Sequence, residues 1–290
     1  MKRKVNKVGT NTLTVSLPSK WVKEQGLSQG DEIDLAEEKS KIIISTKKIP
    51  QTKHIDLDVS KYRDLVGRVI GSIYKQGYDT IRLTFDDPKT IEYIEKELTK
   101  GFIGLDIINS GKNFCELKSL ADIKEEEFNN SYRRVFRLII ENAEELIETL
   151  KEEKFDELKY VAKKDDNVNK FSDLCRRILN KIGTEDTIRT NQLYNIVEEL
   201  ENIGDEFKYL ANHFEKQNSI SEEEIKEIEK VSTYFKEFYE LFYSFSPEKW
   251  TSLLLNFKKL EEEGLGPLTK PIARKIVDLN GPILNLNVVT

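Results

Sequence analysis

Residues 8–22 read Val-Gly-Thr-Asn-Thr-Leu-Thr-Val-Ser-Leu-Pro-Ser-Lys-Trp-Val, and this stretch decides the fold of the N-terminal segment. The turn-forming residues 9–12 precede an alternation of apolar and hydroxyl side chains over residues 13–17, which predicts a half-buried strand. Ser19, directly after a proline, predicts the start of a short helix, and Gly26 predicts its end. A strand followed by a short helix is therefore expected here.

Two further apolar runs follow, at residues 33–35 and 42–44, and predict two strands joined by a charged turn. A unit of fewer than about 50 residues buries too little surface to fold alone without a disulfide, a metal or a partner. Cys115 and Cys175 both lie outside it, and it contains no Cys/His spacing typical of a metal site. We therefore expect two copies to associate, with interleaved strands forming one barrel.

Residues 8–22, with Gly26-Leu27 and Gly30-Asp-Glu-Ile33, resemble the AbrB/MazE-like (SpoVT/AbrB) swapped-hairpin DNA-binding domain. The turn glycines, the proline and the alternating strand occur in the order typical of that family. The resemblance covers residues 2–46. It implies that residues 1–48 form a swapped-hairpin β-barrel that dimerises and binds double-stranded DNA.

The charge of the chain is divided unevenly along its length. Residues 1–48 carry ten Lys/Arg and six Asp/Glu, and residues 1–23 hold six basic side chains and no acidic one. Residues 49–124 are balanced at 12 against 12, and residues 125–290 hold 24 basic and 34 acidic side chains. A small positive end on an acidic chain indicates contact with nucleic acid through one module only.

The candidates for DNA contact are basic or hydrogen-bonding side chains of this N-terminal segment. Lysine and arginine neutralise phosphates, and a loop amide or hydroxyl reaches base edges or phosphate oxygens. Pairing of two chains doubles the six basic groups of residues 1–23. The alternative is a disordered basic tail that serves solubility. The candidates are Lys2, Arg3, Lys4, Lys7, Asn11, Thr12, Lys20 and Lys23.

Residues 49–120 predict a small α/β domain after a polar, proline-containing link. Alternating apolar runs predict strands near residues 55–59 and 81–85, each followed by a helix, and a closing hairpin around Gly111. We expect a ferredoxin-like fold that serves as a spacer or a ligand-sensing module. No glycine-rich phosphate loop occurs in its sequence.

Residues 121–290 predict an all-α bundle, because apolar residues recur at spacings of three and four. Its two halves, about 121–217 and 218–290, read as repeats, and short links predict up-down packing. The expected helices are 125–153, 155–182, 186–215, a fourth opened by a capping box at Ser221 and Glu224, a fifth from Pro247 and a sixth from Pro267 onward.

Carboxylates and amides gather on the polar sides of the second and third of these helices. Glu201 and Asp205 lie one turn apart on the third helix. If the two helices pack side by side, these groups form one carboxylate-rich patch. On the second helix, the side opposite the apolar stripe carries Asp166, Asn169, Asp173 and Arg177.

Residues 166–169 with Arg177, and residues 200–205, resemble the two halves of the PhoU-type helical repeat. Residues 268–287 resemble the closing helix of a second repeat, with Arg274 in the position of an acid and Gly281-Pro282 expected to break the helix. The family implies metal binding through acidic motifs, and oxygen ligands suit Mg, Mn or Fe. The alternative is a solvated charged face. The candidate ligands are Asp166, Asn169 (in place of an expected carboxylate), Asp173, Glu201 and Asp205.

The order of an AbrB-like segment, an α/β segment and a PhoU-like bundle resembles archaeal phosphate-uptake regulators. That resemblance implies a cytoplasmic, homodimeric transcriptional regulator, with phosphate-transport proteins as further partners. Two alternatives stay open: a regulator of a phosphate transporter or sensor kinase through protein contact, and an antitoxin-like binder. We expect no enzymatic activity and no membrane insertion, since no apolar run approaches the length of a membrane span. Two lone cysteines favour a reducing cytoplasm.

Overall fold

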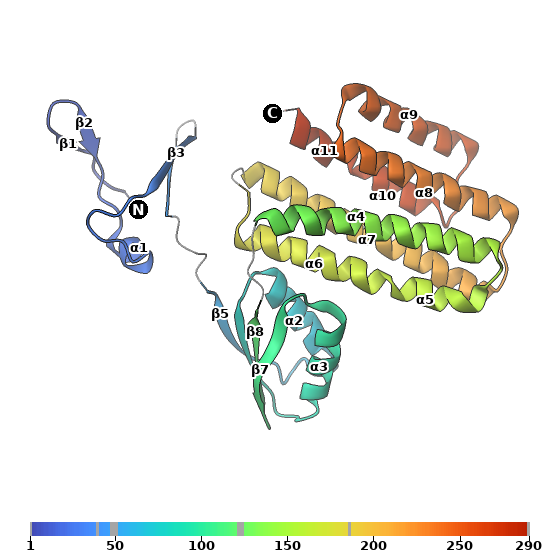
Figure 1. Cartoon of the computed structure of the whole chain (residues 1–290), viewed down its shortest axis with the longest axis horizontal. Helices are drawn as coiled ribbons and strands as arrows, with labels where there is room; N and C mark the ends of the chain where they lie inside the picture. The colour runs from blue at the N-terminus through green and yellow to red at the C-terminus, as the bar shows by residue number, and fades with distance from the viewer. Residues whose placement is uncertain (1, 39–40, 47–51, 121–124, 185–186, 289–290) are drawn as a thin grey trace. The chain divides into compact units, whose positions relative to one another are not determined.

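The computed structural model describes residues 2–38, 41–46, 52–120, 125–184 and 187–288. The chain divides into two compact units, Met1–Gln51 and Thr52–Thr290 (Figure 1). We call the first unit the head and the second unit the body. The expected domain boundaries near residues 48 and 120 stay predictions.

The head contains four short strands and one helix. They are β1 (Asn6–Val8), β2 (Thr12–Thr14), α1 (Ser19–Glu24), β3 (Asp34–Glu38) and β4 (Lys41–Ser45). The expected strand, helix, strand and strand are all present, although β2 is shorter than the alternation over residues 13–17 predicted. The sequence analysis missed β1, because its three residues were interpreted as part of a basic arm.

The strands of the head form two separate hairpins. In the first, Lys7 lies opposite Leu13, and in the second, Leu35 lies opposite Ile44. Gly9 has a φ of +69°, a left-handed conformation that favours glycine at the start of the first turn. Within the described residues, no strand of one hairpin pairs with a strand of the other, so the single chain holds no closed barrel.

The first part of the body is a four-stranded sheet with two helices. Its strands run in the order β5-β6-β8-β7, with β5 and β6 parallel and the other pairs antiparallel. The elements are β5 (His54–Asp58), the 3₁₀ turn η1 (Arg63–Leu65), α2 (Val66–Lys75), β6 (Thr80–Thr84), α3 (Thr90–Gly101), β7 (Leu105–Gly111) and β8 (Phe114–Ser119).

The α/β prediction for this segment is confirmed, but the ferredoxin-like assignment is wrong. A ferredoxin-like chain runs β-α-β-β-α-β. Here both helices precede the closing hairpin, and the first two strands are parallel neighbours. One face of the sheet, represented by Ile81, Leu83 and Leu117, is fully buried in a core shared with α2 and α3. Alternate residues such as Asp56 and Lys118 point to the exposed opposite face.

The rest of the body is helical, as predicted. Its elements are α4 (Glu125–Lys151), the 3₁₀ turn η2 (Phe155–Glu157), α5 (Leu158–Lys163), α6 (Asp165–Lys181), α7 (Thr187–Gln217), α8 (Glu222–Tyr243), α9 (Pro247–Glu263), α10 (Lys270–Asp278) and α11 (Asn280–Asn287). None of the helices in the described part of the chain has both the length and the apolar character that crossing a bilayer requires.

The bundle helices share one large apolar core, and α4, α6 and α7 pack against one another (Figure 1). The predicted capping box is confirmed: the Ser221 hydroxyl accepts from the Glu224 backbone N–H at 3.2 Å, and the Glu224 carboxylate accepts from the Ser221 backbone N–H at 2.8 Å. The last expected helix is divided at Leu279, and Pro282 lies in the first turn of α11. Helices α2 and α3 also pack on α6, which joins the sheet and the bundle into one unit.

Candidate functional site

The predicted DNA-contacting residues are all exposed, and they lie on three parts of the head. Those before or within the first hairpin are Lys2, Arg3, Lys4, Lys7, Asn11 and Thr12, and those on α1 are Lys20 and Lys23. Asn11 occupies the turn between β1 and β2. Lys20 also forms an exposed ion pair with Glu24 at 3.7 Å, a contact that competes weakly with a phosphate.

Among the head residues whose burial the structure describes, none is buried in the single chain. The apolar side chains that alternate along its strands lie largely in the open: Leu13 is 69% exposed, Leu35 64% and Ile42 67%. Trp21 and Val22, expected in the core of a barrel, are only half-buried. Large apolar side chains exposed along strand faces are typical of an interaction surface. The exposed faces therefore fit the predicted pairing of two heads.

The polar side of α6 is covered in part by neighbouring elements: Asp166 is exposed, whereas Arg177 is buried. Arg176, which the sequence analysis missed, is almost fully buried and lies between three carboxylates. Its guanidinium contacts Asp173 at 2.9 Å, Glu198 at 2.8 Å, and Glu201 through a short hydrogen bond. Lys75 of α2 approaches the same Asp173 at 3.5 Å. Two predicted metal ligands are thus brought together, but around an arginine.

This cluster is electrostatically constrained. Burial raises the pKa of the Glu201 carboxyl, against the opposing effect of the adjacent Arg176. Burial likewise raises the pKa of the Asp173 carboxyl, which Lys75 and Arg176 oppose. For Arg176 itself, burial acts to lower the pKa and the carboxylates act to raise it, with a net increase. The guanidinium therefore stays charged and offsets the negative charge gathered around it.

A second cluster lies on the same two helices, at the start of α6 and toward the C-terminal half of α7. Lys208 donates to Asp165 at 2.9 Å and to Asp205 at 3.0 Å. The predicted ligand Asn169 donates its amide to Asp165 at 3.0 Å, and the predicted ligand Asp166 is exposed. Burial raises the pKa of Asp165, against the opposing effect of Lys208. The sequence analysis missed both Asp165 and Lys208.

Four of the five predicted metal ligands, Asn169, Asp173, Glu201 and Asp205, are therefore divided between two polar clusters, and Asp166 is exposed. Among the described residues, no group of three or more His, Cys, Asp or Glu side chains is placed to hold a metal ion. The carboxylates surround a guanidinium and an ammonium group rather than an open coordination position, so this donor set does not fit a metal. The metal site stays a prediction from the sequence alone.

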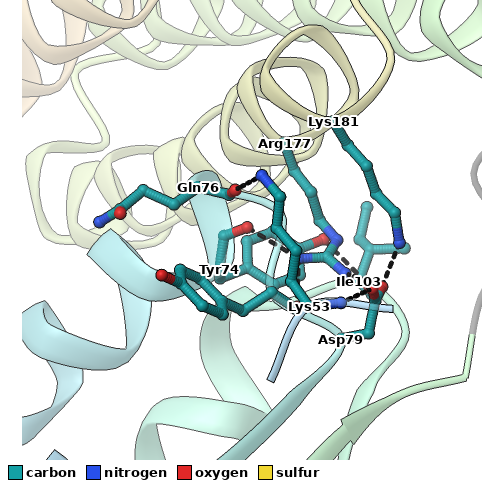
Figure 2. Close-up of polar contacts among 8 residues, drawn as sticks. Lys53, Tyr74, Gln76, Asp79, Ile103, Arg177 and Lys181 are labelled. Carbon is teal, nitrogen blue, oxygen red and sulfur yellow. Dashed lines mark hydrogen bonds and ion pairs between the residues drawn. The ribbon is translucent and has the colours of Figure 1, made fainter. Parts of the chain in front are cut away.

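Arg177, predicted on the polar side of α6, is 1% exposed and is buried against the sheet segment (Figure 2). It donates to the Tyr74 carbonyl at 2.9 Å, to the Tyr78 carbonyl at 2.7 Å and to the Asp79 carboxylate at 3.1 Å. Its guanidinium also lies 4.8 Å from the centre of the Tyr74 ring. Burial lowers the pKa of Arg177, which the neighbouring Tyr74 and Asp79 oppose.

Asp79 contacts both α6 and Lys53, the residue that precedes β5 at the start of the body (Figure 2). Lys181, one turn after Arg177, forms a short hydrogen bond to the same carboxylate oxygen of Asp79. The other oxygen accepts from the backbone N–H of Lys53 at 3.0 Å, and the Lys53 ammonium donates to the Gln76 carbonyl at 3.2 Å. We call Lys53, Asp79, Arg177 and Lys181 the latch. The spacing of Arg177 and Lys181, four residues apart on one helix, is the only sequence signal for it.

Comparison with known proteins identifies the nature of the N-terminal segment. The family model of MazE, described as an antidote-toxin recognition bacterial antitoxin, matches residues 7–53. Neither a curated protein nor a solved structure matches the chain. The match supports the AbrB/MazE-like interpretation and extends to the latch residue Lys53. Residues 7–53 are therefore a MazE/AbrB-like domain.

Proposed function

We propose that this chain is a homodimeric transcriptional regulator that binds DNA through its head. One observation carries the proposal: the MazE/AbrB-like head has six basic residues and no acid within residues 1–23, and none of its residues whose burial the structure describes is buried in the single chain. A second protein surface is needed to cover the apolar faces of its strands. A polyanion such as DNA matches the positive charge of its basic residues.

Pairing of two heads doubles the number of basic side chains available to bind DNA. A dimer places twelve basic side chains from residues 1–23 on one symmetric assembly that carries no acid from the same segment. Each contact with a phosphate releases counterions, so a handful of contacts gives affinity and strong salt dependence. Asn11 lies in the exposed hairpin turn, from which an amide reaches base edges or phosphate oxygens.

Under this proposal the body acts as the sensing part of the regulator and catalyses no reaction. The likeness of residues 166–169 and 200–205 to PhoU-type repeats supports a role in phosphate uptake, with phosphate-transport proteins as partners. The same likeness supports an archaeal, cytoplasmic regulator. The body would fold as a PhoU-like bundle, and the head would pair as a swapped-hairpin barrel.

The test is a DNA-binding titration of the full chain. Sites are first selected from random duplexes, and affinity is then measured by fluorescence anisotropy at 50 to 200 mM salt. We expect Lys2, Arg3, Lys4 and Lys7 changed together to alanine to weaken binding. The slope of log affinity against log salt should fall by about 0.9 for each phosphate contact removed.

A matched control changes four exposed lysines of the body, Lys226, Lys230, Lys258 and Lys259, to alanine and should leave the DNA affinity and its salt slope unchanged. Wild-type affinity in the head variant would contradict the proposal. Equal losses in the head and body variants would also contradict it, because the interface would then not be confined to the head.

A second candidate is an antitoxin-like binder, and the description of the matched family favours it. In that case the acidic body occupies a protein partner, and DNA binding is secondary. A third role, contact with a phosphate transporter or sensor kinase, would use the head only for dimerisation. Both alternatives predict that the four-alanine head variant keeps full biological activity, whereas the regulator predicts its loss.

A further inference from the structure

A cavity of about 310 Å³ lies at one end of the helical bundle. It is formed where α4 and α7 begin and where α6, α8 and α11 end. Its volume falls at the lower end of the range for small-molecule sites. Its walls come from five helices distant in sequence, so the tertiary fold rather than one local motif creates it.

The inner wall of the cavity is apolar and aromatic. Phe128 and Tyr132 stack with ring centres 5.2 Å apart, and the Tyr132 ring meets Phe242 edge-on at 5.1 Å. Ile178 and Leu193 are buried beside them. The Tyr132 hydroxyl is buried and has no hydrogen-bond partner among the described residues, a cost that a bound polar atom would offset. Aromatic walls of this kind suit a planar apolar body.

The mouth of the cavity is polar and carries a positive charge. Arg189 and Asn129 line it and are exposed. The guanidinium of a second arginine, Arg133, lies 4.4 Å from the centre of the ring of Tyr243, another wall residue. Within the described part of the chain, neither arginine forms an ion pair. Arginine at the edge of an apolar pocket is suited to a carboxylate, sulfonate or phosphate.

This charge pattern is unusual for the body, which is acidic over residues 125–290. A groove between α8 and α9 is lined by five glutamates and three lysines, and a groove between α4 and α8 by four glutamates and two lysines. Among the residues that the structure describes, the lining of the bundle-end cavity contains an arginine and no acidic side chain. This described lining therefore favours an anion more than the two glutamate-lined grooves do.

We propose that the bundle-end cavity binds a small organic anion whose planar aromatic or heterocyclic body lies between the aromatic walls and whose acidic group contacts Arg189 at the mouth. Ile178 and Ile182 line the cavity from the same two turns of α6 that carry the latch residues Arg177 and Lys181. The cavity is thus the sensing site of the regulator. That last role rests on the proposed function, whereas the binding itself does not.

The test uses 8-anilino-1-naphthalenesulfonate, an aromatic anion whose fluorescence rises in apolar sites, titrated into the full chain without DNA. We expect Arg189→Gln to weaken binding about ten- to a hundred-fold, as for loss of a charge-assisted contact. Ile182→Trp should abolish binding by filling the cavity. Arg134→Gln, which removes an arginine of α4 outside the cavity, and Leu255→Trp on α9 are the matched controls and should bind as the wild type does.

Competition experiments distinguish the contribution of the aromatic ring to binding from that of the acidic group. Phenyl phosphate should displace the probe from the cavity, whereas benzyl alcohol, which lacks the charge, and inorganic phosphate, which lacks the ring, should not. Equal displacement by either partial ligand would overturn the proposal, as would wild-type affinity in Arg189→Gln or Ile182→Trp. If Ile182→Trp fails to fold by circular dichroism, Arg189→Gln, at an exposed side chain, decides alone. Because no DNA is present, failure here leaves the DNA-binding proposal to its own test.

Discussion

The head and the body of this chain use apolar residues in opposite ways. In the body, apolar side chains form two cores, one under the sheet and one among the bundle helices, with many members fully buried. In the head, the strands alternate in the same manner, yet Leu13, Leu35 and Ile42 are each more than 60% exposed. The sequence patterns alone would not separate these two cases.

The difference teaches that a periodic pattern predicts a buried face but not which chain buries it. Small units bury a low fraction of their surface, so a segment of this size depends on a partner. The body buries its apolar pattern within one chain, whereas we propose that the head buries its own only with a second copy. The same substitution made in the head and in the body therefore tests this difference most clearly.

The largest expected effect comes from charging the exposed apolar face of the head. Leu35→Glu places a carboxylate opposite Ile44 in the β3–β4 hairpin, on a face that we expect to be buried by pairing. We expect loss of the dimer and a fall in DNA affinity to the non-specific level, about a thousand-fold or more. Sedimentation velocity and anisotropy on the full chain measure the two effects.

The matched control is Leu255→Glu on α9, since this leucine is also exposed, at 52%. It should alter neither assembly nor DNA affinity. If Leu35→Glu behaves like this control, the exposed face of the head is ordinary surface, and the contrast between the two regions disappears.

The reactivity of the thiols of Cys115 and Cys175 tests whether the two apolar cores of the body are closed to solvent. Burial raises the pKa of Cys115 from 9.0 to about 12, and burial also raises that of Cys175. At pH 8 the Cys115 thiolate should be about a thousand-fold scarcer than an ordinary one, so a disulfide reagent should label it only after unfolding.

The sign of the pH dependence follows from the same shift. The folded chain keeps the Cys115 proton above pH 9.0, where the unfolded chain loses it, so this thiol should lower the stability of the body as pH rises from 9.0 toward about 12. Cys115→Ala should show a weaker decline in urea unfolding over that range. Rapid labelling of both thiols in the folded protein would contradict the assignment of two closed cores.

Breaking the latch should destabilise the body by about 3 kcal/mol, as for removal of one partner of a buried ion pair. Arg177→Met removes the guanidinium from Asp79 and leaves the carbonyls of Tyr74 and Tyr78 without this donor. Arg134→Met removes an exposed arginine paired with Glu141 at 3.1 Å and should cost at most about 1 kcal/mol. If Arg177→Met and Arg134→Met lower the free energy of unfolding in urea by similar amounts, the latch does not act as a buried ion pair.

The smallest effect concerns helix ends. Ser221→Ala removes the capping box of α8 and should lower the stability of the body by about 1 kcal/mol. Helix α1 of the head has no side-chain cap, so Ser19→Ala should change little. Thermal unfolding of both variants measures this contrast, and a larger loss for Ser19→Ala would show that the cap assignments are reversed.

Local signals in the sequence were sufficient for most helices and strands. The spacing of Ser221 and Glu224 predicted the start of α8, and the regular three-and-four spacing predicted α4 and α7 to within a few residues. In the head, β1 was missed because Lys7 and its neighbours were interpreted as a charged arm. A three-residue strand carries too little alternation to outweigh its charge.

The long-range polar contacts could not be predicted in this way. Arg177 meets Asp79 across 98 positions in the sequence, and a helical wheel of α6 places Arg177 correctly without revealing that the sheet segment covers it. Arg176 and Lys208 likewise pair with the carboxylates that had suggested a metal site. A wheel gives directions from one helix, whereas burial depends on the neighbouring elements.

The central claim is that the head folds only when paired, whereas the body folds by itself. Hydrogen–deuterium exchange of the full chain at a series of protein concentrations tests this most directly. Peptides covering β1 to β4 should lose protection on dilution, at the concentration where the dimer dissociates, while those covering α4, α6 and α7 keep theirs. Protection of the head that is unchanged by dilution into the monomer range would contradict the account.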